Sequence, residues 1–248
     1  NTDGFSSQHS LFNDAYLSQL EDSSSIKIAK DGVSLGFVSG YLDRENEQSI
    51  KKFNLSFSNN FDKGLSITAR LSHMEEDKTF LSNYFSGAYK TGEARTNTLS
   101  LSAKLQPTTD IKLIAQYDQG NTNVKSLKDS VVSDISILKS QHYSATALKK
   151  GLYFKDDVLF ASITQPLQIT KGDLTLRMAN GLNSNDSINF VDRHLSIAKS
   201  KLENEITLGY SADYAKNSQV IILFNRANVF VKSIELENQL MIKINKKF

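Results

Sequence analysis

Apolar and polar residues alternate along most of this chain. Near the carboxyl end, Leu240, Ile242 and Ile244 are separated by Met241 and Lys243. A period of two places successive side chains on opposite faces of a β-strand, so each such run predicts a strand with one apolar and one polar face. A helix would instead need apolar residues at a spacing of about 3.6. The pattern therefore predicts an all-β fold.

The same alternation recurs in further runs along the chain. They lie near residues 33–41, 53–57, 65–72, 99–105, 111–117, 136–149, 159–163, 174–178, 187–199, 202–212 and 219–230, before the closing strand. These runs predict about twelve antiparallel strands, an even number such as bacterial single-chain membrane barrels have. An even number also puts the start of the first strand and the end of the last at the same rim.

The connections between these runs are of two kinds. Short links at residues 59–64, 106–110 and 213–217 are rich in Asn, Asp, Gly and Pro, whereas residues 75–93 and 120–134 form longer polar stretches. We expect the short links at a periplasmic rim and the long stretches at an extracellular rim, which is the asymmetry of a transmembrane barrel. A soluble β-sandwich gives no reason for this separation.

Composition excludes a helical membrane protein but does not by itself favour a barrel, and the lack of Trp argues against one. The mean hydropathy is −0.35, and no stretch approaches the ~18 uncharged apolar residues that a spanning helix needs. The absence of Cys is typical of the cell envelope, and 9 Tyr and 14 Phe could supply interfacial aromatics in a chain without Trp. The net charge of +2 comes from interspersed charges without a basic stripe, which argues against a nucleic-acid partner.

The amino-terminal stretch has a different pattern. Helical spacing, with Ser10 as a plausible cap, relates Leu11, Phe12, Ala15, Tyr16 and Leu20. We expect a short helix within residues 1–25, which is a linker, and a barrel domain at residues 26–248. A short surface helix is the alternative for this stretch.

Several segments resemble the translocator barrels of autotransporters of the subtilisin-like (S8) serine protease type. They are residues 159–169 (LFASITQPLQI) followed by Lys171 and Gly172, residues 193–196 (RHLS), residues 205–211 (EITLGYS) and residues 246–248 (KKF). The resemblance spans about the last hundred residues, and the first half agrees mainly in strand spacing. Gln168 departs from the family, which commonly has Arg at this position.

The resemblance implies a translocator domain of type V secretion in the outer membrane of a Gram-negative bacterium. Such a domain is a monomeric barrel that contacts outer-membrane lipid. It assists export of its own N-terminal passenger, and the resemblance implies that this passenger is a subtilisin-like protease. Periplasmic chaperones and the outer-membrane assembly machinery would be its other partners. The insertion signal would be the terminal strand, with Leu240, Ile242, Ile244 and Phe248.

In this family the passenger's last segment stays inside the lumen as a helix. The helix predicted here would carry Asn13, Asp14, Gln19 and Glu21, facing lumen-lining candidates Arg70, Lys104, Lys112, Gln116, Arg177 and Glu205. Opposite charges on the helix and the wall would favour a plugged pore. Ordinary solvated lumen residues are the alternative for the same side chains.

The chain carries few residues suited to catalysis. No cofactor or metal is expected, because the His residues lack the spacing of a zinc site and no nucleophile motif is present. The acids at residues 75–77 and 156–157 are typical of loops and turns, with a weak calcium site as the alternative. A hydrolase would depend on His142 and His194 with Ser140, Asp192 and Ser196. A passive channel is the other alternative.

Overall fold

The computed structural model describes residues 16–17, 22–43, 48–61, 64–81, 83–84, 87–155, 157–199, 203–215, 218–228 and 238–246. Within these ranges the chain is built of antiparallel β-strands, so the predicted all-β class is confirmed. Among the same residues, no helix is long and apolar enough to cross a membrane.

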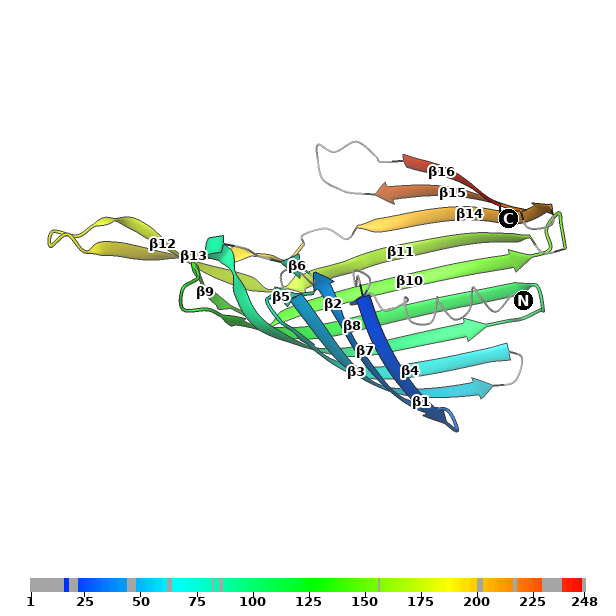
Figure 1. Ribbon diagram of the computed structural model, residues 1–248, viewed down its shortest axis with the longest axis horizontal. Coiled ribbons are helices and arrows are strands. Elements are labelled where there is room, and N and C mark those ends of the chain that lie inside the picture. The colour runs from blue at the N-terminus through cyan, green and yellow to red at the C-terminus, as the bar shows by residue number, and fades with distance from the viewer. Residues whose placement is uncertain are drawn as a thin grey trace.

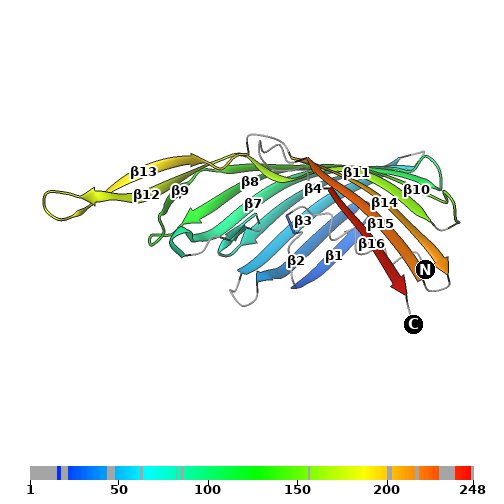
Figure 2. The same cartoon turned by 90° about the horizontal axis from the view of Figure 1, so that it is seen from above.

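The main sheet contains eleven of the described strands (Figure 1). Their order follows the sequence: β1 (Asp22–Lys30), β2 (Val33–Asp43), β3 (Gln48–Phe61), β4 (Leu65–Glu76), β7 (Thr91–Leu105), β8 (Ile111–Ser126), β10 (Leu138–Lys150), β11 (Val158–Lys171), β14 (Asn204–Ala215), β15 (Ser218–Asn228) and β16 (Asn238–Lys246). Neighbours in this order are joined by hairpins or longer excursions. The sheet curls into a trough, with β1 and β16 as its two edges (Figures 1 and 2).

Smaller elements occur in the excursions from the main sheet. β12 (Asp173–Leu182) lies between β13 (Ile188–Ser196) and β9 (Val132–Ile135) in a three-stranded sheet. The β12–β13 hairpin projects from the trough in both views (Figures 1 and 2). Between β4 and β7 lie β5 (Thr79–Phe80), β6 (Asn83–Tyr84) and the 3₁₀ turn η2 (Gly87–Tyr89).

The strand count differs from the expected twelve at two places. The runs near 174–178 and 187–199 form β12 and β13, which pair with each other and not with the main sheet. None of the predicted runs covers β1, which begins at Asp22, within the residues assigned to the linker. Asp31 and Gly32 both have positive φ, as the two central residues of a type I′ hairpin turn do. This turn connects β1 to β2, and the two strands pair along their length.

The two ends of the trough carry different connections. One end, which we call the turn rim, holds the short links β1–β2, β3–β4, β7–β8, β10–β11 and β14–β15. The other end, the loop rim, holds the short β2–β3 link and the longest connections, which contain β5, β9 and the β12–β13 hairpin. The links predicted to be short and the stretches predicted to be long therefore lie at opposite ends.

With eleven strands and not twelve, the described main sheet begins and ends at opposite rims. Because each neighbouring pair in the described sheet is antiparallel, its first and eleventh strands run in the same direction. β1 begins at the loop rim, with Asp22 opposite Tyr41, whereas β16 ends at the turn rim. The expectation of a shared rim is wrong for this sheet, and the closed barrel stays a prediction.

Candidate functional site

The concave face of the trough is polar and buried. One row across the strands contains Asn54, Ser72, Thr98, Gly120 and Ser140 at directly paired positions. Ser72, Thr98 and Ser140 are at most 8% exposed. Further buried polar side chains on this face are Lys52, Ser56, Glu76, Thr96, Asp118 and Thr122. Hydroxyl, amide and charged groups therefore line the concave face of the trough.

The convex face has the opposite character. Leu35, Leu55, Leu71 and Leu99 are paired in register across β2, β3, β4 and β7. Leu71 is 53% exposed and Leu101, two residues beyond Leu99, is 47% exposed. The terminal strand continues this face, since Leu240, Ile242 and Ile244 lie opposite Phe224, Ile222 and Val220. Large apolar side chains thus cover the outside of the sheet.

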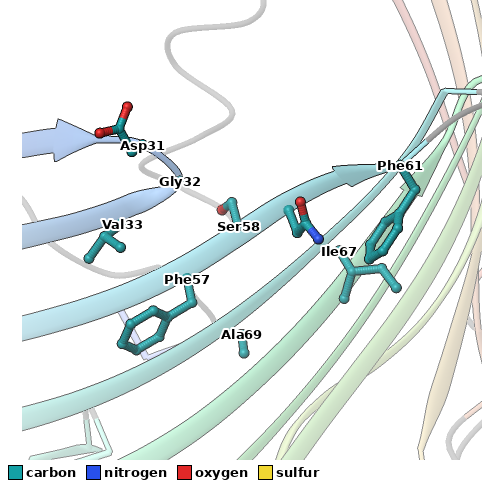
Figure 3. A pocket seen from close by; sticks show the side chains of 9 residues that line it. Asp31, Gly32, Val33, Phe57, Ser58, Phe61, Ile67 and Ala69 are labelled. Carbon is teal, nitrogen blue, oxygen red and sulfur yellow. The ribbon is translucent and has the colours of Figure 1, made fainter.

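Hollows on the convex face are apolar as well. Figure 3 shows one near the turn rim, where Phe57, Phe61, Ile67 and Ala69 lie around a space of about 430 Å³ beside the Asp31–Gly32 turn. Gly32 is required in that turn, because a Cβ atom there would lie 2.3 Å from the Ser58 carbonyl oxygen. The lining offers an apolar surface without a cluster of catalytic groups.

Tyr16 lies on the concave face, in contact with strands far apart in the sheet. Its hydroxyl is 3.0 Å from Ser140 Oγ on β10, and its ring lies 5.2 Å from Lys52 Nζ on β3. A Cβ atom at Gly120 on β8 would meet the Tyr16 hydroxyl at 2.4 Å, so glycine makes room for the ring. Tyr16 therefore packs against the concave face of three strands.

An apolar cluster occupies the loop-rim end of the concave face. Leu17, next to Tyr16, packs there with Phe80 and Leu81 from the β4–β7 connection. The strands and the small sheet contribute Val38, Ile50, Met74, Ala94, Val124, Val132, Ile135, Leu138 and Leu176. Tyr16 itself belongs to this cluster, and its hydroxyl meets the polar side chain of Ser140.

Five of the six lumen-lining candidates lie on the concave face. Arg70, Lys104, Lys112, Gln116 and Glu205 occupy the same side of the sheet as Ser140, by the strand register. Arg177 does not: it lies on β12 in the small sheet, with its guanidinium 5.2 Å from the Phe190 ring. Asn13, Asp14, Gln19, Glu21 and Phe248 lie outside the described residues.

The residues suggested for a hydrolase fall into two separate groups. Ser140 and His142 lie two positions apart on the concave side of β10. The other group, Asp192, His194 and Ser196, lies on β13 in the small sheet. His142 Nδ1 is 2.8 Å from Asp118 Oδ2 on the concave face. His194 lies in the small sheet, with Nδ1 3.0 Å from Thr175 Oγ1, and Asp192 is paired with Arg177 there. Asp118 also accepts a hydrogen bond from Gln116 Nε2 at 2.7 Å. The carboxylate, not the imidazole, is the centre of this network, which differs from a nucleophile activated by histidine.

Two of the acidic residues predicted for loops and turns, Glu76 and Asp157, bind backbone amides there. Glu75 instead lies on β4, 3.5 Å from the Arg95 side chain, and residue 156 lies outside the described residues. Glu76 accepts hydrogen bonds from the Leu81 amide at 2.9 Å and from Thr79 Oγ1 at 3.5 Å. Asp157 accepts bonds from three backbone amides and from the Tyr210 hydroxyl. Burial raises the pKa of Asp157, but these donors outweigh it and lower the pKa to about 2. Sequence reasoning missed Tyr210 as a partner, since no local pattern connects the two.

The described residues contain no group of three or more His, Cys, Asp or Glu side chains placed to hold a metal ion. No protein family, no curated protein and no solved structure matches this chain.

Proposed function

We propose that this chain is an outer-membrane β-barrel that serves as the translocator domain of an autotransporter. The observation that carries the proposal is the inverted distribution of polarity, with polar side chains buried on the concave face and leucines exposed on the convex face. In water this arrangement would expose a large apolar surface, whereas in a bilayer the same surface faces lipid. Closure of the barrel, with the β1 and β16 edges joined directly or through one further strand, is part of the proposal.

The extent of the apolar surface supports a membrane span. On β7 the convex positions from Leu99 to Leu105 are apolar, and Asn97 and Arg95 precede them toward the loop rim. At about 3.3 Å per residue, a run of seven residues extends roughly 23 Å along the strand. Strands of outer-membrane barrels tilt by about 45° and cross the bilayer with about 9–11 residues, so this run covers roughly two thirds of a crossing. The charges beyond this run would lie at the level of the headgroups.

Tyr16 supports a translocator over an open channel. Tyr16, which precedes β1 in the sequence, lies on the concave face and contacts β3, β8 and β10. Ser72 Oγ and Thr98 Oγ1, in the row of Ser140, have no hydrogen-bond partner within the described part of the chain. A wall with such unused hydroxyls suits an interior that admits water or a polypeptide. The subtilisin-like passenger, the chaperones and the assembly machinery remain proposals that rest on the resemblance.

A barrel can be tested by its behaviour in detergent. The refolded chain should migrate faster on a detergent gel when unboiled than when boiled, because a closed membrane barrel resists unfolding by detergent until it is heated. Its far-UV circular dichroism should be of the β type. A chain that stays in solution without detergent and shows no heat shift would contradict the proposal.

Conductance in planar bilayers separates a plugged translocator from a channel. Deleting residues 1–21 removes Tyr16 and leaves β1 intact, so we expect a sharp rise in single-channel conductance. Tyr16→Ala should produce a smaller rise. Tyr89→Ala is the matched control, because Tyr89 is 49% exposed in η2 and should leave conductance unchanged. Equal conductance of the full-length and deleted chains would favour the passive channel.

A further inference from the structure

Asp157 organises the connection between β10 and β11 at the turn rim. Its Oδ1 accepts the Leu152 amide at 2.7 Å, and its Oδ2 accepts the amides of Tyr153 at 2.8 Å and Phe154 at 3.0 Å. The Tyr210 hydroxyl donates to Oδ2 at 2.8 Å. The carboxylate is fully buried. One side chain therefore fixes the backbone of residues 152–154 and ties it to β14.

The same turn holds its largest side chains away from the protein. Tyr153 is 80% exposed, Phe154 is 58% exposed and the adjacent Leu152 is 39% exposed. Three consecutive large apolar side chains in contact with water are unfavourable in a turn. A buried carboxylate with four donors nevertheless keeps this arrangement in place, which indicates that the tip is built for contact with another apolar or interfacial medium.

The tip adjoins the apolar convex face. The Tyr153 and Tyr210 rings meet edge to face, with centroids 6.4 Å apart and planes at 77°. Tyr210 is paired with Leu159 and Ile222, both exposed apolar residues of the convex face. The aromatic tip thus extends the apolar surface at the turn rim, where a membrane surface would lie if the convex face spans the bilayer.

Lysines flank the tip. Lys149 is paired with Leu159, and its Nζ atom donates a hydrogen bond to Asp110 Oδ2 at 3.2 Å. Lys155 is exposed within the turn. Aromatic rings settle at the headgroup level of membranes, and lysines beside them reach the lipid phosphates. The combination of Tyr, Phe and Lys on one turn therefore fits the polar boundary of a bilayer better than it fits its centre.

We propose that the turn formed by residues 151–155 and Asp157 is a membrane-interface anchor, in which Asp157 presents Tyr153 and Phe154 to the lipid headgroup boundary on the turn-rim side. The inference rests on the proposed membrane span and adds a defined lipid contact outside the strands. It also gives a role to aromatic residues in a chain that lacks Trp.

The absence of Trp makes the anchor measurable, because each introduced Trp is the sole one in the chain. Phe154→Trp reports on the tip, and Leu101→Trp reports on the apolar band of β7. Both variants are reconstituted in vesicles of lipids brominated either near the headgroup or near the end of the acyl chain. We expect headgroup-proximal bromine to quench Trp at position 154 more strongly, and deep bromine to quench Trp at position 101 more strongly.

The outcomes separate the anchor from the membrane span. Quenching at position 101 without quenching at position 154 would overturn the anchor and leave the proposed barrel standing. No quenching at either position would overturn the proposed barrel, and the anchor with it. Asp157→Asn, added to Phe154→Trp, should weaken the headgroup-proximal quenching. An amide nitrogen cannot accept a hydrogen bond, so at least one of the four donors loses its acceptor whichever way the Asn amide is turned.

Two further variants guard against a general loss of structure. Asp186→Asn, in the exposed turn between β12 and β13, is the matched control and should leave the quenching at position 154 unchanged. Tyr210→Phe removes one of the four donors to Asp157 and keeps the ring, so it should weaken the quenching less than Asp157→Asn does. Unchanged quenching in the Asp157→Asn variant would overturn the role assigned to that carboxylate.

Discussion

At the scale of single residues, Asp157 gives the sharpest dependence on pH. Burial opposes its charge, yet four hydrogen-bond donors hold the pKa near 2, below the ordinary value of 3.8. The charged carboxylate therefore stabilises the turn at pH values above 3.8, and this contribution is lost as the pH falls toward 2. A ¹³C shift titration of the carboxyl group should have its midpoint near 2. Tyr210→Phe should raise that midpoint, and a midpoint at the ordinary value would contradict the hydrogen-bond geometry.

The sequence predicts the kind of residue at such positions better than it predicts the partners. Asp157 stands beside Asp156 in a polar link, so a turn acid follows from local chemistry, but Tyr210 is 53 positions away. Tyr16 reads as one apolar residue of a short helix, and nothing local indicates that its hydroxyl meets Ser140, 124 positions away. Contacts of this kind depend on the curvature and register of the whole sheet.

At the scale of strands, alternation predicts where most strands lie but not which sheet they join. β12 and β13 alternate as strands of the main sheet do, with Leu174, Leu176 and Met178 on one face of β12. β12 and β13 nevertheless form a separate sheet with β9, and Arg177 on β12 therefore lies outside the main sheet. β1 escaped prediction because Ser23, Ser24 and Ser25 carry no apolar residue to mark its beginning.

The two faces of β7 should respond differently to the same charge. Leu101 is exposed on the convex face, and Ser102 is its neighbour on the concave face. A lysine near the middle of the lipid-facing surface costs about 2–4 kcal/mol, whereas a lysine in a polar lumen is tolerated. We therefore expect Leu101→Lys to lower the free energy of unfolding in vesicles by about that amount.

Ser102→Lys is the matched control for this measurement, since it places the same side chain one residue further along the strand. It should change the free energy of unfolding much less than Leu101→Lys. Equal losses for the two variants would mean that the convex face does not contact lipid. A larger loss for Ser102→Lys would mean that the faces are assigned the wrong way round.

At the scale of the whole molecule, the number of strands determines which ends of the sheet share a side of the membrane. The described main sheet has eleven strands, so β1 starts at the loop rim and β16 ends at the turn rim. A direct β1–β16 seam would be parallel, and an antiparallel closure would need one more strand between these edges. The resemblance to autotransporters, by contrast, implies an even number with both ends at the periplasmic rim. The side on which β1 begins therefore distinguishes the two arrangements.

Single cysteines can locate these ends, because the chain has no native Cys. Ser23 lies at the start of β1, Asn185 at the tip of the β12–β13 hairpin and Thr109 in the β7–β8 turn, and all three are exposed. Long connections face outward in outer-membrane barrels. A membrane-impermeant maleimide should therefore label Ser23→Cys and Asn185→Cys on intact cells, and Thr109→Cys after permeabilisation.

If Ser23→Cys behaves as Thr109→Cys does, β1 begins at the periplasmic rim and the main sheet has an even number of strands. If Thr109→Cys is labelled on intact cells and Asn185→Cys is not, the orientation required for export of a passenger is excluded.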